Sequence, residues 1–169
     1  TEPYSISWTG PSGYTASTDT ITGLVAGTYT LTATDHNNCT TYSFIEVISE
    51  PDAIEITGSV VSDHGGYGVT CPESADGSIT VTATGGTPTL SYSWTGPSGY
   101  TSDQASISFL MAGLYSLTIT DAAGCIHAEE YTLTAPEPMI ITAVTNEASC
   151  PDTPDGSIDL TVAGGSGTL

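Results

Sequence analysis

Hydrophobic and polar residues alternate in short runs along most of the chain. In the run 29–34, Tyr29, Leu31 and Ala33 take every second position and threonines fill the others. A period of two predicts β-strands that bury one face, and turns rich in Gly, Pro and Asp separate the runs. No stretch has the 3.6-residue period of an amphipathic helix. The pattern therefore predicts an all-β chain.

The alternating runs recur in tandem. The sequence AGTYTLTATDHNNC at 26–39 returns 86 positions later as AGLYSLTITDAAGC at 112–125, and SWTGPSGYT recurs at the same offset. Self-similarity of this kind indicates a repeat protein. Aligning the copies divides the chain into the C-terminal part of one repeat, a complete repeat and the N-terminal part of the next, with bounds 1–50, 51–135 and 136–169.

The complete repeat is predicted to be one of a series of tandem immunoglobulin-like antiparallel β-sandwich repeats. Trp94 and its counterpart Trp8 are expected to fill the space between the sheets. Tyr115 and Tyr29 stand at the position of a tyrosine corner, where a hydroxyl ties a strand to the preceding turn. A glycan-stacking platform is the alternative role for these aromatic residues. The expected strands are 54–60, 78–84, 91–95, 105–110, 114–120 and 126–134.

Each full repeat is expected to carry two cysteines, which in the complete repeat are Cys71 and Cys125. If six strands alternate in direction, both cysteines lie at the same end of the sandwich, and we expect a disulfide between them. Such a bridge implies an oxidising compartment outside the cytoplasm. By the same reasoning Cys39 and Cys150 are expected to pair with cysteines outside this chain. A zinc site is not favoured, because the cysteine spacings contain no C-x-x-C knuckle.

The composition narrows the class of partner. The chain has no Lys or Arg and 19 acidic residues, which gives a formal charge of −19. Such a surface repels nucleic-acid phosphates and anionic lipids, and no apolar run approaches the ~18 residues of a membrane span. We therefore expect no nucleic-acid binding and no membrane insertion of this segment.

The complete repeat resembles the SprB repeat. The pattern C-P-x-x-x-D-G-S-I-x-V-x-x-x-G-G, then Y-S-W, then L-x-A-G-x-Y-x-L-x-I-x-D-x-x-G-C runs without a break over 71–125. SprB repeats occur in many copies in very large surface adhesins of gliding and related Bacteroidota. The resemblance implies a filament on the bacterial cell surface that is exported by the type IX secretion route and serves adhesion and, in gliding members, motility. Its partners would be the neighbouring repeats of the same long chain.

Candidate sites are few. Asp76, Asp155, Asp35 and Asp121 recur in turn sequences, where an Asp side chain is expected to bond the backbone. Calcium, which prefers oxygen ligands, is the alternative role for these four residues. Thr20 lies in D-T-I, which resembles an O-glycan acceptor of this phylum. No acid–base pair or nucleophile–base set is visible as a repeated feature, so we expect no enzymatic activity and no cofactor apart from calcium.

These observations favour a structural repeat segment of a long extracellular adhesin or filament. The alternative is a carbohydrate-binding β-sandwich module of a secreted enzyme, for which Tyr14 and Tyr100 are the repeated aromatic residues expected to be exposed. The insertion at 62–68 is interpreted as a lengthened loop. Because 136–169 supplies the two front strands that 1–50 lacks, a third arrangement has one molecule complete another, head to tail.

Overall fold

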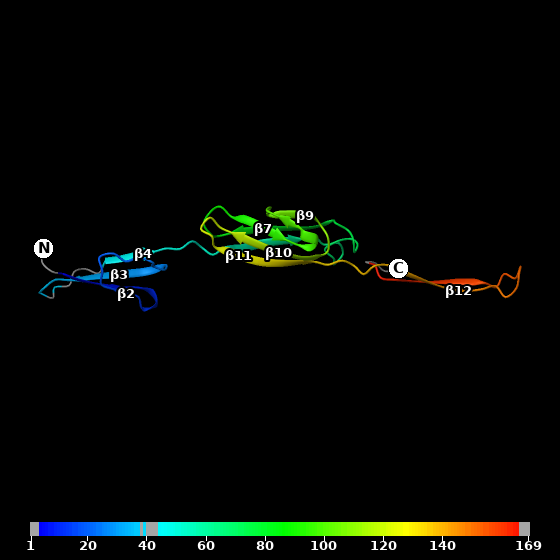
Figure 1. Cartoon of the computed structure of the whole chain (residues 1–169), viewed down its shortest axis with the longest axis horizontal. Coiled ribbons are helices and arrows are strands. Elements are labelled where there is room, and N and C mark those ends of the chain that lie inside the picture. Colours follow the sequence, from blue (N-terminus) through cyan, green and yellow to red (C-terminus); the bar gives the residue numbers. More distant parts are fainter. Residues whose placement is uncertain (1–3, 38, 40–43, 166–169) are drawn as a thin grey trace. The chain divides into compact units, whose positions relative to one another are not determined.

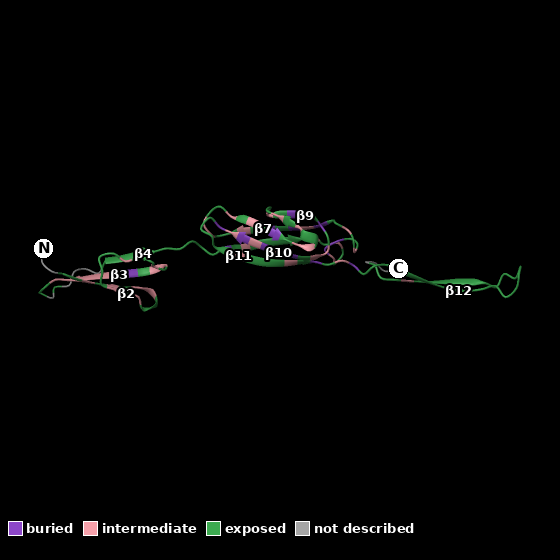
Figure 2. Cartoon of the chain, viewed as in Figure 1, coloured by how far each residue is buried: buried purple, intermediate pink, exposed green. Residues whose placement is uncertain are grey.

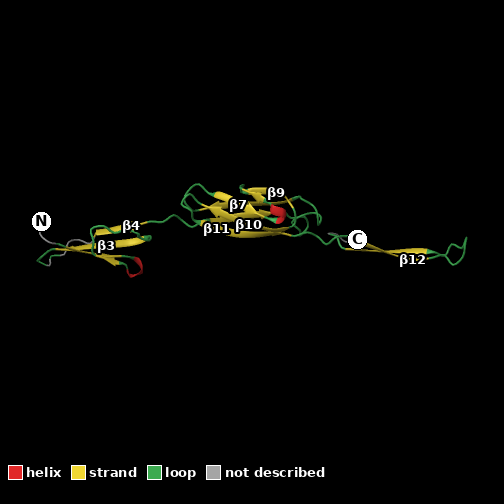
Figure 3. Cartoon of the chain, in the orientation of Figure 1, coloured by secondary structure: helices red, strands yellow, loops and turns green. Residues whose placement is uncertain are grey.

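The computed structural model describes residues 4–37, 39 and 44–165, and the chain divides into two units, Thr1–Pro51 and Asp52–Leu169. Strands joined by loops make up the described part (Figure 3), in which the helical residues are confined to two 3-10 turns, η1 (Pro11–Gly13) and η2 (Pro97–Gly99). All the strand pairs are antiparallel within this part. The predicted all-β fold is confirmed, whereas its immunoglobulin-like character stays a prediction.

The described residues of the first unit form a four-stranded sheet in the order β2-β1-β3-β4 (Figure 1). Its central pair aligns Trp8 with Leu31 and Ile6 with Ala33. The strands are β1 (Ser5–Thr9), β2 (Thr15–Ala16), β3 (Gly27–Thr34) and β4 (Phe44–Ile48).

The second unit contains a two-sheet sandwich followed by a hairpin. One sheet has the order β5-β6-β9, the other β11-β10-β7-β8, and the hairpin pairs β12 with β13. The sandwich strands are β5 (Glu55–Val61), β6 (Gly77–Thr84), β7 (Ser91–Thr95), β8 (Thr101–Ser102), β9 (Ser106–Leu110), β10 (Gly113–Thr120) and β11 (Ile126–Leu133). The hairpin strands are β12 (Ile140–Asn146) and β13 (Ser157–Ala163).

The core of the sandwich follows from the alternation of its strands. On β10 the buried residues are Tyr115, Leu117 and Ile119, and the threonines and serine between them are partly exposed. Ile79 and Val81 of β6 face them from the other sheet, so the two apolar faces cover each other. Buried positions gather between these strands in Figure 2. Trp94 of β7 is fully buried, which agrees with the expectation that this indole fills the space between the sheets.

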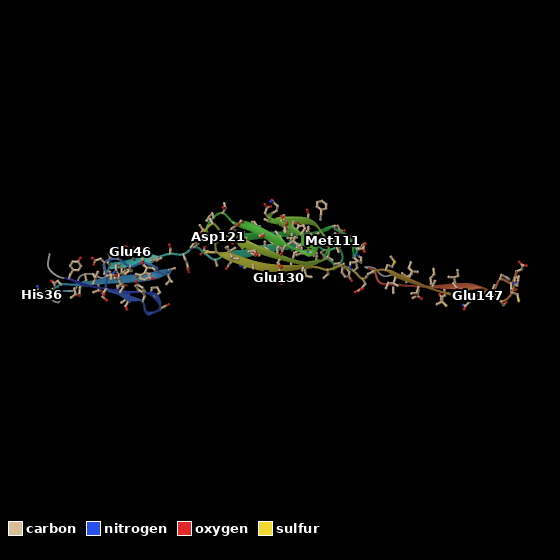
Figure 4. The ribbon with its side chains drawn as sticks, in the orientation of Figure 1. His36, Glu46, Met111, Asp121, Glu130 and Glu147 are labelled. Carbon is tan, nitrogen blue, oxygen red and sulfur yellow. The ribbon has the colours of Figure 1, made fainter. Side chains whose placement is uncertain are left out.

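The sandwich has two distinguishable ends. At one end, the proximal end, Asp52 O accepts a hydrogen bond from Gly86 N–H, and β10 turns into β11 through Asp121 to Cys125. At the other, the distal end, Thr134 O accepts hydrogen bonds from Gly68 and Val69, just before the segment that leads to β12. Figure 4 labels Asp121 and Met111 at these opposite ends. The chain therefore enters the sandwich at its proximal end and leaves it at its distal end.

The two cysteines of the complete repeat lie at opposite ends, and the predicted disulfide between them is not formed. Cys71 belongs to the distal loop between Gly68 and Gly77, whereas Cys125 directly precedes β11 at the proximal end. The length of β11 separates these ends by about 25 Å, while a disulfide needs Cα atoms within about 7 Å. All four cysteines are free and exposed. That Cys39 and Cys150 pair outside this chain stays a prediction.

The error arises from the two-residue strand β8, which the sequence pattern does not reveal. β8 follows the η2 turn and pairs with β7, Trp94 opposite Ser102. It adds one reversal of direction between β7 and β9, so that β10 is the sixth strand rather than the fifth. The turn after β10 consequently lies at the proximal end, away from Cys71.

A close approach of backbone and ring fixes the η2 turn. A Cβ atom added to Gly96 would lie 2.6 Å from Cδ1 and Cε1 of the Tyr115 ring, and Gly10 stands in the same relation to Tyr29. The Tyr115 hydroxyl donates to Met111 O at 3.0 Å, the contact expected of a tyrosine corner. The ring is thus held from both sides and cannot yield to a larger residue at position 96.

We predict that Gly96→Ala destabilises the sandwich by about 1–3 kcal/mol, because the new methyl group overpacks the Tyr115 ring. Thermal or urea unfolding followed by tryptophan fluorescence measures the effect. Gly58→Ala is the matched control, since a Cβ atom at Gly58 meets nothing within 4 Å. Equal stability of the two variants would contradict the packing argument.

We also predict that reductant leaves the melting temperature of the sandwich unchanged. A Cys71–Cys125 bridge would contribute about 4 kcal/mol in the chain-entropy model, so its reduction would lower the melting temperature by many degrees. Melts with and without a phosphine reductant, combined with peptide maps of alkylated protein, test this directly. Recovery of a Cys71–Cys125 peptide from monomeric protein would restore the sequence-based prediction.

Candidate functional site

A buried carboxylate organises the proximal end of the sandwich. Asp121 is 6% exposed, and its Oδ1 accepts hydrogen bonds from the N–H groups of Ala123 at 2.9 Å and Cys125 at 2.8 Å. Its Oδ2 accepts a third from Thr87 N–H at 2.8 Å. The first two bonds close the β10–β11 turn, and the third joins it to the loop after β6. One side chain therefore ties the two sheets together at this end.

These bonds favour the charged carboxylate. The Thr87 N–H group is the largest influence and lowers the pKa of Asp121 below its ordinary 3.8, outweighing the partial desolvation that raises it. The N–H groups of Cys125 and Ala123 add to the lowering. Asp121 is thus an ionised anchor in neutral solution.

The same turn is built in the first unit. Asp35 Oδ1 accepts hydrogen bonds from the N–H groups of Asn37 at 2.9 Å and Cys39 at 2.8 Å. The recurring T-D-x-x-x-C sequence therefore encodes a carboxylate-closed turn, in which Asp bonds the backbone two and four residues on. The cysteine contributes its backbone N–H to this turn in both copies.

A second pair of carboxylates shapes the loop that precedes each D-G-S strand. Asp76 accepts from Thr70 N–H at 3.1 Å and from Thr70 Oγ1 at 2.5 Å. Asp155 accepts from Ser149 N–H at 2.9 Å and from Ser149 Oγ at 2.5 Å. In each case the hydroxyl is the leading cause of a lowered carboxylate pKa. In both copies, the hydroxyl residue six positions before the aspartate thus closes the loop that contains the cysteine.

The four aspartates named as candidate calcium ligands do not converge on one another. Each accepts hydrogen bonds from donors in its own turn or loop, and Asp121 also accepts one from Thr87. Within the described residues no group of three or more His, Cys, Asp or Glu is placed to hold a metal ion. The geometry gives these residues a turn-forming role, and calcium binding stays a prediction.

The repeated aromatic residues lie in or against the core. Trp94 Nε1 donates to Gln104 O at 2.9 Å, and the indole packs on Tyr131 with ring centroids 5.6 Å apart. Tyr100 meets the Tyr115 ring edge-on at 5.6 Å and is only partly exposed. Tyr14 packs on Tyr29 in the same way. Tyr14 and Tyr100 are therefore packed against other rings and are only partly exposed, rather than fully exposed as expected for a sugar-stacking platform.

The structure also places side chains together that the sequence pattern does not connect. A groove of about 410 Å³ lies between the edge strands β5 and β11. Inside it, His127 Nε2 lies 3.8 Å from Glu129 Oε2. Because its residues come from strands far apart in the sequence, no local motif could have indicated it. The lining residues are Glu55, Ile56, Ser59, His127, Glu129 and Tyr131.

The insertion at 62–68 forms an ordered loop at the distal end. Ser62 Oγ donates to Gly68 O at 2.6 Å, and Gly66 N–H donates to Asp63 Oδ1 at 2.6 Å. His64 lies inside it, and its Nε2 is buried without a hydrogen-bond partner.

In the first unit Thr20 is exposed in a loop, where glycosylation stays a prediction.

Comparison with known proteins gives one match. The SprB repeat family model matches residues 69–99 and 142–168. The first segment covers β6, β7 and η2, and the second covers β13 and most of β12. No curated protein matches the chain.

In the part of the chain that the structure describes, no helix has the length and apolar character needed to cross a membrane.

We predict that Asp121→Asn lowers the melting temperature of the sandwich by several degrees, because the amide cannot accept all three N–H donors. The folded-state pKa of Asp121 is lowered, so its stabilisation is present above the ordinary value of 3.8 and is lost as the pH falls through the lowered value. The gap between wild type and variant should accordingly be widest near neutral pH and narrow in acid. Asp103→Asn, at an exposed carboxylate, serves as the control. A gap of constant size from pH 7 to pH 3 would contradict the charged-anchor role.

Proposed function

Because the chain carries SprB repeats at 69–99 and 142–168, we propose that it is a structural segment of a long extracellular adhesin or filament on a bacterial surface. The family match confirms the SprB resemblance and covers the first part of the motif, up to residue 99. At the family level it supports a repeat segment of a surface adhesin, and SprB repeats form a family of structural repeats rather than of enzymes.

The observation that carries the proposal is the path of the chain through the sandwich. Residue Asp52 is bonded at the proximal end and Thr134 at the distal end, with β11 running the full distance between them. A domain whose two connections leave from opposite ends can be joined in series without folding the chain back. This connectivity supports a stalk built from successive sandwiches.

The short joints between successive repeats are expected to restrict bending. The sequences S-E-P-D-A at 49–53 and A-P-E-P-M at 135–139 carry Pro51, Pro136 and Pro138. Proline fixes φ near −65° and stiffens a short connection. Short proline-containing joints hold a series of domains apart, and the proposed partners of each repeat are its neighbours in the same long chain.

The charge of the chain suits an exposed filament. With 19 acidic residues and no Lys or Arg, its surface repels other copies of itself and the anionic surfaces of cells. Adhesive contacts are therefore proposed to lie in another part of the adhesin or in exposed loops such as 62–68. Export by the type IX route and a role in gliding belong to the same proposal, which rests on the family resemblance.

A carbohydrate-binding module is less well supported. Such a module needs flat aromatic surfaces facing solvent, whereas Trp94 and Tyr115 are core residues. Tyr14 and Tyr100, the repeated alternatives, lie edge-on against other tyrosine rings. The geometry of these residues favours the stalk.

A polyclonal antiserum that recognises the sandwich in both its folded and its denatured form tests the proposal on the cells that produce the protein. We predict that it labels intact, unpermeabilised cells and detects a denatured polypeptide many times larger than the 17.2 kDa of this chain. An antibody against a cytoplasmic protein, which should label permeabilised cells only, is the control. A band near 17 kDa, or labelling that requires permeabilisation, would overturn the proposed function.

A further inference from the structure

One side of the sandwich, between β5 and β11, ends in two unpaired strand edges. β5 is an outermost strand of one sheet, and β11 is an outermost strand of the other. All eight residues of β11 pair with β10, and within the described residues β11 has no other strand partner. Its outer side therefore presents backbone N–H and C=O groups that no neighbouring strand uses. An edge of this kind can accept a further strand.

β11 is the more regular of the two edges. Its ladder with β10 runs without a break along the whole strand, whereas the ladder between β5 and β6 shifts register between Ile56 and Gly58. A bulge bends and twists an edge strand, which discourages further pairing. An added strand is therefore expected on β11 rather than on β5.

A carboxylate occupies an inward position on β11. Glu129 lies opposite Leu117, which is only 1% exposed, and residues directly opposite each other point to the same face of a sheet. The corresponding residue of the first unit is Phe44, which lies opposite Leu31 in the β3–β4 pair. Because an apolar side chain at this position adds to hydrophobic burial, the fold itself does not require Glu129.

Glu129 lines the groove of about 410 Å³ between the two edges, together with Glu55 and His127. The side chain of Glu129 is 51% exposed, and among the described residues its ion-pair partner is His127, at 3.8 Å. The chain has no Lys or Arg, so it offers no ammonium or guanidinium group to either carboxylate. The groove therefore has a negative potential that a cation from outside can neutralise.

The groove also offers apolar contact. Ile56 and Tyr131 line it beside the two carboxylates, and the Ser59 side chain is hydrogen-bonded to Tyr131, which joins β5 to β11. Lysine and arginine bury their methylene groups along apolar surface while the charged end stays in polar surroundings. A groove with both kinds of surface suits such a side chain.

We propose that the groove between β5 and β11 binds an extended peptide segment of a basic partner protein. The segment adds to the free edge of β11 as a further strand, and one of its lysine or arginine side chains enters the groove and pairs with Glu129. Main-chain hydrogen bonds supply affinity, and the charged pair supplies specificity. Charge complementarity selects this occupant, because strands of a chain with a formal charge of −19 and no Lys or Arg are repelled from the same edge.

An inward-facing charge on an edge strand also has a purely protective explanation, since it discourages pairing between copies of a protein. Protection alone requires that acidic and neutral strands be rejected, and it gives a basic peptide no preference for this groove over the rest of the acidic surface. The inference goes beyond the proposed function and does not rest on it, because the groove lies within one complete repeat.

Calorimetric titration of the 169-residue chain with a synthetic peptide of alternating lysine and threonine, as long as β11, tests the inference at physiological salt. Glu129→Gln should weaken binding at least about tenfold, because it removes a charge-assisted hydrogen bond. Glu130→Gln is the matched control, since Glu130 is the next residue of β11, lies opposite the partly exposed Ser116 (Figure 4) and carries the same charge. No saturable binding, or equal losses in the two variants, would overturn the inference.

Two modified peptides test strand addition on the wild-type chain, so that this test depends on no variant. One carries methyl groups on alternate backbone nitrogens and keeps its lysines, and the other has glutamine in place of lysine. Each should bind at least about tenfold more weakly, because the first loses main-chain hydrogen bonds and the second loses the charged pair. Hydrogen exchange should show that the unmodified peptide adds protection to the amides of β11. Full affinity of the N-methylated peptide, or added protection that spares β11, would overturn the inference.

Discussion

Mutual coverage of two sheets is the constraint on which the rest of the structure depends. An alternating strand buries only one face, so a sheet made of such strands is stable only where a second sheet lies over it. In the complete repeat Trp94 and Tyr115 occupy the space between the sheets, and burial of such rings dominates the energy of a core. The front strands β5 and β6 are therefore needed to cover the apolar face of the other sheet. The corresponding residues at either side of the complete repeat are more exposed: Trp8 and Leu31 are partly exposed, and Ile158 is exposed.

Side-chain hydrogen bonds pin the turns and loops of both units. The Tyr29 hydroxyl and the Trp8 indole donate to backbone carbonyl groups of the loop between β2 and β3. The Asp35 and Asp155 carboxylates close turns within their own segments. These bonds join residues that are close in sequence, so they recur wherever their sequence motif recurs. Burial between the two sheets of the complete repeat adds the free energy of the hydrophobic effect to these local bonds.

The alternating hydrophobic pattern of the sequence predicts the long strands correctly. It does not predict the direction in which each strand runs. Alternation located every long strand of the sandwich, and the spacing around Tyr115 indicated the tyrosine corner that its hydroxyl makes. A strand of two residues has no periodicity, so β8 could not be read from the pattern. Missing it reversed the direction expected of β10 and brought Cys71 and Cys125 to the same end. The turn-forming aspartates were recognisable because each bonds residues close in sequence, whereas the Asp121 contact with Thr87 and the groove between β5 and β11 depend on tertiary pairing.

The absence of Lys and Arg leaves hydrogen-bond donors as the partners of Asp121, the buried one of these aspartates. A carboxylate that leaves water must find either a cation or several hydrogen-bond donors, and this sequence offers it no lysine or arginine. Asp121 finds three N–H groups, which lower its pKa and keep it charged inside the proximal turn. The remaining carboxylates stay in water and repel one another across the surface. The same composition thus makes backbone N–H groups, rather than cationic side chains, the partners of the buried carboxylate in the proximal turn.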